Sequence, residues 1–498
     1  MRRVGPFVCD APGGAFARLE GMLMLRSWRT IRRQVRFEHA SESHKIAPQW
    51  AQHLGIPGAV RRGRRRVTPS RTPAQRWAPR IRPSTSVSGP ESARSWRNLC
   101  ADTPRRLPMT EVSCVSTSTL PPAEGAVIGR DGLTALVEVL RARGYTVVGP
   151  TVQDGAIVLR ELESAAQLPY GWGVDLEAGQ YRLRPRTDGA AFANAAGPQS
   201  WKTFLHPARV RQWTAERVDG ELVIEADDTP PPRFAFLGVR SCDLRAVAVQ
   251  DRVLTAGPHP DPTYRGRRSG AFLVAVECTE PGGTCFCASM GTGPAAGPGY
   301  DLVMTELVDD AGHRFWIRGG SPQGTDVLAE LPGEPASEAL RTAAVRAVAS
   351  AAGRMGRTMP DTDLHRLMAE TLDAPRWDDV ASRCLTCGNC TMVCPTCFCT
   401  TTEDVTDLTG NHAERWRVWD VCFDLDFSYL PGGPVRASPR SRYRQWLTHK
   451  LGTWYDQFGS SGCVGCGRCV VWCPVAIDIT EEAAALYDWT RRAEDGAS

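Results

Sequence analysis

Two copies of one cysteine pattern lie near the C-terminal end of this 498-residue sequence. The first copy comprises Cys384, Cys387, Cys390 and Cys394, and the second comprises Cys463, Cys466, Cys469 and Cys473, with Pro395 and Pro474 after their last cysteines. In bacterial ferredoxins this spacing holds two [4Fe–4S] clusters, and the fourth cysteine of each copy ligates the other cluster. We therefore expect a first set of ligands, Cys384, Cys387, Cys390 and Cys473, and a second set, Cys463, Cys466, Cys469 and Cys394.

Zinc and disulfides are the alternative uses of these cysteines. Structural zinc sites usually pair C-x2-C units across a longer gap. Disulfides suit secreted chains, and no stretch of this sequence has the pattern of a secretory signal. Gly388, Gly465 and Gly467 favour iron–sulfur clusters, because glycine lets the backbone approach an inorganic core and donate N–H groups to its sulfur.

Seven further cysteines lie between residues 242 and 422 and form two more groups. The third set is Cys242, Cys278, Cys285 and Cys287, and the fourth set is Cys397, Cys399 and Cys422. Residues 284–287 and 396–399 share the sequence Thr-Cys-Phe-Cys. The two cysteine pairs in these segments would either each serve a metal centre or together ligate a single centre. We expect the third set to bind a third cluster, because it offers four thiolates and a Gly-rich loop. The fourth set is its rival and is otherwise unassigned. Buried free cysteines are the alternative for both sets.

A mixed α/β domain is expected for residues 120–335. Residues 131–143 carry Leu133, Leu136, Val137 and Leu140 at helical spacing. Strands are expected at 146–150, 157–159, 221–225, 234–239 and 271–276. The last two are short uninterrupted apolar runs, which favours strands in the core of a sheet.

Helices are expected in the rest of the chain. A helical linker at 336–383 contains residues 338–355 and 361–372, the latter with Leu364, Leu367, Met368 and Leu372 on one side. Residues 384–495 are expected to form a helical ferredoxin-type domain with two [4Fe–4S] clusters. The 68 residues between its cysteine copies carry Trp416, Trp419, Tyr443, Trp446 and Trp454, and Thr480 is expected to cap the last helix, ahead of Glu481 and Glu482. The predicted fold class is α+β, a mixed α/β domain followed by an all-helical dicluster ferredoxin domain.

Arginine dominates residues 1–108, which hold 21 Arg and one Lys against six acidic residues. The rest of the chain holds 37 basic and 49 acidic residues. After the Arg-rich run 61–66 the sequence is rich in Pro, Ser and Thr, and it offers too little apolar surface to offset the entropy cost of folding. We interpret this segment as a disordered extension, or as sequence ahead of a true start at Met109. A nucleic-acid-binding arm and a transit peptide are the alternatives.

The motifs resemble those of the beta subunits of soluble hydrogenase/sulfur reductase complexes of the sulfhydrogenase type, and of the related A subunits of anaerobic sulfite reductases. The matching stretches are residues 278–294, 384–399, 440–451 and 463–480. Residues 1–108 have no counterpart in this resemblance, which favours Met109 as the start. Residues 240–243 depart from the family pattern, in which a proline precedes the cysteine that corresponds to Cys242.

The resemblance implies an electron conduit without a catalytic centre of its own. Its implied partners are the small and large subunits of a [NiFe]-hydrogenase and a flavin subunit that binds NAD(P), between which it would relay single electrons. An anaerobic sulfite reductase or another reductase complex is the alternative setting. We assign no motif of the chain to nickel, flavin or nicotinamide.

Two other functions compete with electron transfer. A stand-alone reductase would need an open iron site or a reactive thiol, for which Cys397, Cys399 and Cys422 are the candidates. A nucleic-acid-responsive sensor rests on the run 61–66 alone, and a charged block is more often a solvated tail. The sequence has no apolar run of about 18 residues, so no membrane segment is expected. Many thiolate ligands and no secretory signal predict a cytoplasmic protein.

Overall fold

The computed structural model describes residues 125–495. They belong to the second of the two units into which the chain divides, Pro121–Ser498. The Arg-rich segment 1–108 and the expected start at Met109 lie outside the described residues. Among the residues described, no helix has the length and apolar character needed to cross a membrane.

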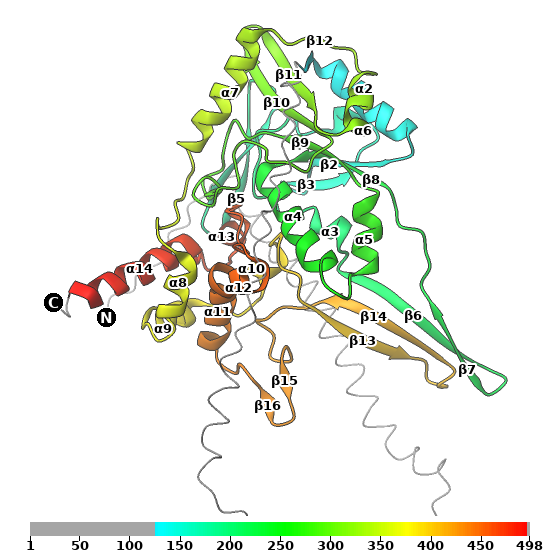
Figure 1. Ribbon diagram of the computed structural model, residues 1–498, viewed down its shortest axis with the longest axis vertical. Coiled ribbons are helices and arrows are strands. Elements are labelled where there is room, and N and C mark those ends of the chain that lie inside the picture. The colour runs from blue at the N-terminus through cyan, green and yellow to red at the C-terminus, as the bar shows by residue number, and fades with distance from the viewer. Residues whose placement is uncertain (1–124, 496–498) are drawn as a thin grey trace, which may run out of the picture. The chain divides into compact units, whose positions relative to one another are not determined.

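An eight-stranded sheet forms the centre of the mixed region, in the order β12-β1-β11-β10-β9-β8-β2-β3 (Figure 1). Its strands are β1 (Ala126–Ile128), β2 (Thr146–Gln153), β3 (Ala156–Glu161), β8 (Phe234–Val239), β9 (Phe272–Val276), β10 (Leu302–Asp309), β11 (Gly312–Gly319) and β12 (Glu334–Pro335). The four strands from β10 to β2 are parallel, and the outer strands pair antiparallel. β8 and β9 are almost wholly buried, as their apolar runs predicted, because helices cover both faces of a parallel sheet.

Helices pack on both faces of this sheet. α2 (Arg130–Ala142) and α6 (Pro322–Leu328) cover one face, and α3 (Lys202–Leu205), α4 (Ser241–Thr255) and α5 (Pro262–Ser269) cover the other. Successive residues of β8 point to opposite faces, so Leu237 lies in one core with Leu133 of α2, while Phe236 lies in another core with Leu244 of α4. α7 (Glu338–Ala352) packs beside β10 and β11 through Leu340 and Ala344. The predicted helices at the start and end of this region are thus confirmed.

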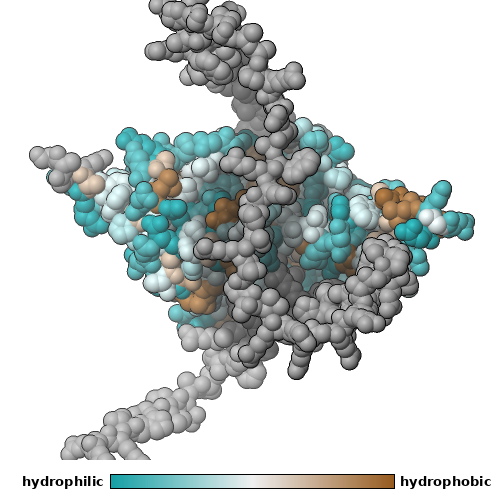
Figure 2. All heavy atoms as spheres, turned by 90° about the horizontal axis from the view of Figure 1, so that it is seen from below, coloured by the Kyte–Doolittle hydropathy of each residue, from teal (hydrophilic) through white to brown (hydrophobic). Residues whose placement is uncertain are grey.

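A second, four-stranded sheet joins the mixed region to the cysteine-rich region. Its order is β13 (Thr400–Thr406), β14 (His412–Trp419), β6 (Arg209–Val218) and β7 (Glu221–Ala226), all antiparallel. Each region therefore contributes one hairpin, and β14 pairs with β6 between them. Leu222, Val223 and Ile224 of β7 are exposed. Figure 2 shows hydrophobic side chains gathered at the right-hand edge, where Figure 1 places the outer end of this sheet.

Helices surround the C-terminal cysteines. They are α8 (Leu364–Glu370), α9 (Arg376–Arg383), α10 (Asn389–Met392), α11 (Pro439–Thr448), the π-helix η2 (His449–Thr453), α12 (Trp454–Phe458), α13 (Arg468–Val471) and α14 (Ile479–Asp495). A second core, which includes Trp377, Phe423, Tyr443 and Trp446, holds them together. A mixed α/β region followed by a helical cysteine-rich region confirms the predicted fold class.

Three details differ from the expectations drawn from the sequence. The segment between the cysteine copies holds two hairpins besides its helices, β13–β14, which carries Trp416 and Trp419, and β15 (Tyr429–Leu430) with β16 (Gly433–Pro434). α8 ends at Glu370, so Leu372 lies exposed beyond the helix. Asp478, not Thr480, caps α14, because the Asp478 carboxylate accepts hydrogen bonds from the backbone N–H (3.0 Å) and the hydroxyl (2.7 Å) of Thr480.

Candidate metal centres

The two cysteine copies fold in the same way. In each, a glycine with positive φ, Gly388 (77°) or Gly467 (72°), leads into a one-turn helix, α10 or α13. Glycine suits this position because other residues rarely adopt such a φ. The third cysteine lies in the short helix and the fourth lies just beyond it. Since α10 and α13 pack against each other, the fourth cysteine of each copy reaches the loop of the other.

The four cysteines of the first set line one pocket. The pocket is lined by Cys384, Cys387, Cys390, Cys469 and Cys473 and by apolar side chains that include Phe423, Tyr443, Trp446 and Ile477. Burial raises the pKa of Cys390, and the charges of nearby thiolates raise it further. The structure thus brings Cys473 to the three cysteines of the first copy. A space walled by sulfur and apolar side chains suits a cubane cluster shielded from water.

The second set combines Cys394 with Cys463, Cys466 and Cys469. Burial raises the pKa of Cys463 to about 12, and the charges of Cys466 and Cys394 add to this increase. Burial raises the pKa of Cys469 as well, followed by the charges of the other three thiolates. The four thiols therefore lie within electrostatic range of one another.

A buried lysine contacts the second set. Lys450 Nζ donates hydrogen bonds to Cys394 Sγ (3.4 Å), Thr396 Oγ1 (2.9 Å) and Gly462 O (3.1 Å). Burial disfavours the charged ammonium, but the thiolate charges of Cys394, Cys397 and Cys463 together raise the pKa of Lys450 above that of an ordinary lysine. A fixed positive charge thus stands beside these thiolates.

The third set lies at the carboxyl edge of the central sheet. Cys242 is in the first turn of α4, which follows β8, and Cys278 follows β9. Since β8 and β9 are parallel neighbours, these two cysteines meet at one edge. Cys285 and Cys287 lie in the loop that follows. Burial, then the charges of Cys278 and Cys285, raise the pKa of Cys287. Burial also raises the pKa of Cys242, and the charges of Asp243 and Cys287 add to this increase, so the structure brings the third set together.

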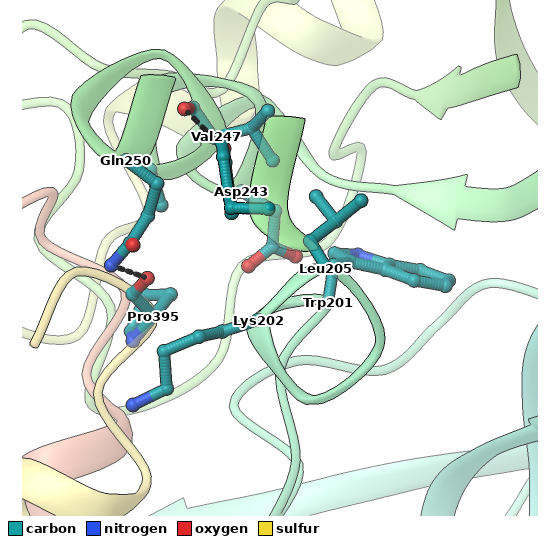
Figure 3. Close-up of a pocket in the computed structure, with 9 residues that line it drawn as sticks. Trp201, Lys202, Leu205, Asp243, Val247, Gln250 and Pro395 are labelled. Atoms are coloured by element: carbon teal, nitrogen blue, oxygen red, sulfur yellow. Dashed lines mark hydrogen bonds between the residues drawn. The ribbon is translucent and has the colours of Figure 1, made fainter. Parts of the chain in front are cut away.

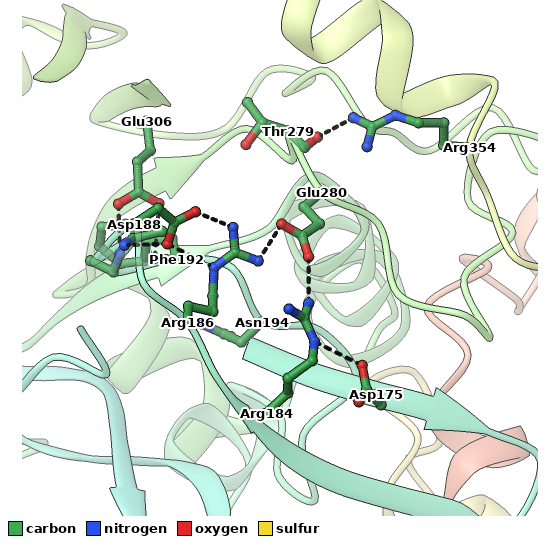
Figure 4. Close-up of polar contacts among 12 residues, drawn as sticks. Asp175, Arg184, Arg186, Asp188, Phe192, Asn194, Thr279, Glu280, Glu306 and Arg354 are labelled. Carbon is green, nitrogen blue, oxygen red and sulfur yellow. Dashed lines mark hydrogen bonds and ion pairs between the residues drawn. The ribbon is translucent and has the colours of Figure 1, made fainter. Parts of the chain in front are cut away.

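Polar contacts fix the loops of the third set. The Ser241 hydroxyl lies within hydrogen-bond distance of two carbonyl oxygens, Thr292 O at 2.8 Å and Ala295 O at 2.5 Å, and donates its one hydrogen between them. A proline at position 241 would make neither contact, which gives the departure from the family pattern a structural role. Glu280, near Cys278, accepts hydrogen bonds from Arg184 (3.1 Å) and Arg186 (2.6 Å) (Figure 4). These arginines belong to the hairpin of β4 (Trp172–Glu177) and β5 (Gln180–Pro185) and the residue after it; the 3₁₀-helix η1 (Ala165–Gln167) precedes this hairpin.

The third set also packs against the loop of the second set. The Phe286 N–H donates to Gly465 O (2.9 Å), and Thr292 Oγ1 donates to Val464 O (2.7 Å). Gly465 has φ +65°, and a Cβ atom there would lie 2.6 Å from the backbone nitrogen of Cys287. The close approach of these two loops therefore requires glycine.

The fourth set lies at the base of the β13–β14 hairpin. Cys397 and Cys399 precede β13, and Cys422 follows β14. Burial raises the pKa of Cys422 to about 12, followed by the charge of Cys399. The segment ahead of Cys397 is anchored to α4, because Gln250 Nε2 donates to Pro395 O at 3.2 Å (Figure 3).

Among residues 125–495, no three His, Cys, Asp or Glu side chains converge as the ligands of a single ion do. The ligands of a cubane need not converge in this way, because each cysteine binds a different iron.

Sequence reasoning missed the buried charged residues near these sets. Lys202, Lys450 and Arg468 are each less than a tenth exposed, whereas lysine and arginine are normally surface residues. The sequence signal for Lys450 was its place in the 440–451 stretch that carries part of the family resemblance.

Known proteins support the interpretation of these loops. Residues 383–477 match the family model of the 4Fe-4S dicluster domain. Sulfhydrogenase 2 subunit beta of Pyrococcus furiosus is 33% identical over 257 residues, which cover 49% of this chain and 72% of that protein. No solved structure shows significant similarity to the chain. The chain belongs to the family of sulfhydrogenase beta subunits, and it is an iron–sulfur electron-transfer subunit of an oxidoreductase complex that carries 4Fe-4S clusters.

Proposed function

We propose that this chain relays single electrons between a [NiFe]-hydrogenase module and a flavin subunit that binds NAD(P), within a hydrogenase/sulfur reductase complex of the cytoplasm. The name of the Pyrococcus furiosus relative supports the hydrogenase setting. The abundance of thiolate ligands supports a reducing compartment.

The first and second sets would each hold one [4Fe–4S] cluster. The observation that carries this assignment is the exchange of the fourth cysteine, with Cys473 beside the first copy and Cys394 beside the second. Bound clusters would accept and release one electron at a time with little change of geometry. The side chains of Phe423, Tyr443 and Trp446 would keep water from the first cluster.

The third set would hold a further cluster. Its four thiolates lie together, and its loop contacts the second set through Phe286 and Gly465. Electrons would then pass from the first site to the second and on to the third, or in the reverse direction. The mixed α/β region would thus carry one end of the relay and the helical region the other.

Anaerobic purification, iron and sulfide analysis and a reductive titration followed by EPR test this proposal. We expect brown protein with about four iron atoms per occupied set and at least two magnetically interacting centres. Cys463→Ser and Cys285→Ser should each lose about one cluster. Cys114→Ser, outside all four sets, is the matched control and should keep the wild-type iron content. Protein that stays colourless after reconstitution with iron and sulfide would refute the proposal.

Purification of the tagged chain from its native cells tests the partners. We expect co-purification of both [NiFe]-hydrogenase subunits and a flavoprotein. Recovery of a sulfite-reducing subunit in their place would contradict the hydrogenase assignment. The isolated chain should not reduce sulfur compounds with an artificial donor.

A further inference from the structure

The base of the β13–β14 hairpin gathers residues from two separate stretches of the chain. Thr400 pairs with Trp419 at the end of the two strands, and the Asp420 N–H donates to Cys399 O at 2.9 Å. The antiparallel register therefore sets Cys397 and Cys399, which lead into β13, beside Asp420 and Cys422, which follow β14. Three cysteines and one aspartate thus share one end of the hairpin, and the Cys397 thiol there also forms a hydrogen bond with that of Cys394.

Two buried ammonium groups face this end of the hairpin. Lys202 Nζ donates to Cys397 O at 3.0 Å and lies 4.0 Å from the centroid of the Trp419 ring. In Figure 3 the Lys202 side chain extends toward the segment that carries Pro395. Lys450, the second cation, contacts Thr396 and Cys394. A buried cation is costly unless negative charge lies close by, and a carbonyl oxygen with an indole face supplies little of it to Lys202.

The two Thr-Cys-Phe-Cys segments contact the same loop, the one that carries Cys463 and Cys466, at two different residues. Residues 284–287 contact it through the Phe286 N–H and Gly465 O, at 2.9 Å. Residues 396–399 contact it through Thr396 Oγ1 and Gly462 O, at 2.6 Å. The first segment supplies two thiolates of the third set, so the second segment is built and placed like a ligand-bearing one.

We infer that the fourth set binds an iron–sulfur cluster of its own, held by the thiolates of Cys397, Cys399 and Cys422 and by the carboxylate of Asp420. This inference rests on the proposed function. It adds a further cluster to the proposed electron relay, next to Cys394 of the second set. The negative charge of the cluster and its ligands offsets the charges of Lys202 and Lys450. A non-thiolate ligand is compatible with such a centre, since histidine replaces cysteine at one iron of Rieske clusters.

Native mass spectrometry of the anaerobically purified wild-type chain tests the inference without any variant. Four bound clusters are expected, whereas three or fewer would overturn it. Iron analysis gives an independent measure, with about 16 iron atoms per chain expected. A chain with three clusters would contradict only this inference. A chain with two clusters would also contradict the cluster proposed for the third set, and a chain with no iron would contradict the proposed function as a whole.

Variants locate the centre. Cys399→Ser and Cys422→Ser should each lose about four iron atoms and one EPR-active centre, while the signals of the first two clusters persist. Asp420→Cys should keep the full iron content and shift the reduction potential and spectrum of one centre only. Cys285→Ser is the matched control, which should lose a different centre. Wild-type iron in both serine variants, or an unchanged spectrum in Asp420→Cys, would contradict the ligand assignment.

Discussion

Arg468 and Asp243 form a buried bidentate ion pair that joins two cysteine-bearing helices. Arg468 Nη1 lies 2.9 Å from Asp243 Oδ1, and Nη2 lies 3.3 Å from Oδ2. The two residues are 7% and 3% exposed. Asp243 follows Cys242 on α4, and Arg468 precedes Cys469 on α13. The pair therefore fixes the spacing between the second and third sets.

Asp243→Asn should destabilise the protein by about 3–5 kcal/mol, because it leaves the Arg468 guanidinium buried without its anion. The midpoint of urea unfolding under anaerobic conditions measures the effect. Glu370→Gln is the control, since it removes one partner of the exposed Arg366–Glu370 pair and should cost about 0.5 kcal/mol or less. Equal midpoints for the two variants would show that the buried pair contributes no more to stability than the exposed pair.

Gly465→Ala should lower the iron content of the second and third sets. Alanine at φ +65° costs about 1–2 kcal/mol in backbone strain, and its Cβ would also push the Cys287 backbone away. Gly410→Ala shares a positive φ, +72°, but meets no atom within 4 Å, so it should keep its iron. Iron analysis and EPR of both variants separate the steric effect from strain, and a wild-type result for Gly465→Ala would speak against the close packing of these loops.

Lys450→Met should lower the reduction potential of the nearest cluster by on the order of 100 mV, because the lysine charge stabilises the more negative, reduced state. The contact of Lys450 with Cys394 identifies the second cluster as the one most affected. An EPR-monitored potentiometric titration measures the shift. Lys450→Arg keeps the charge and should shift the potential much less. Equal shifts in both variants would mean that altered packing, and not the loss of charge, changes the potential.

His206 should make the stability of the protein depend on pH below about 6.5. Burial, followed by the charges of Arg417 and Lys202, lowers the pKa of His206 to about 3, and Arg417 Nη1 donates to Nδ1 of the neutral ring at 3.2 Å. The unfolded ring gains a proton near pH 6.5. Between these two values the unfolded state binds more protons, so stability falls as the pH falls.

His206→Gln should remove this dependence. From pH 6.5 to 5.5 the variant should lose about 1 kcal/mol less stability than the wild type. Urea midpoints at the two pH values, with a sample at pH 7.5 as reference, provide the measurement. An equal loss of stability in the variant and the wild type would contradict this prediction, because it would mean that His206 binds protons equally in the folded and unfolded states.

Local patterns in the sequence were enough to predict two central strands, β8 and β9, but not their neighbours β10 and β11. β8 and β9 are continuous apolar runs whose burial follows from their composition alone. The cysteine spacing predicted which fourth cysteine meets which loop, because that geometry belongs to the motif.

Tertiary pairing determined the parts that the sequence did not predict. Every residue of β13 after Thr400 is exposed, so this strand has no buried face to produce an alternating pattern. It pairs with β14, which in turn pairs with β6 about 200 residues away, a contact that no local pattern encodes. The burial of Lys202 and Lys450 was not predicted for a similar reason. The groups that compensate their charges come from distant parts of the chain.

The pairing of β14 with β6 limits how the chain can be shortened. A fragment that began at residue 384 would keep both ferredoxin-like cysteine copies, but β14 would present an open edge and Arg417 would lose its ion pair with Asp261. Open strand edges promote association between copies. Residues 384–495 are therefore not a ferredoxin domain that can be moved to another protein by itself. A minimal redox fusion partner taken from this chain would have to retain the hairpin of β6 and β7.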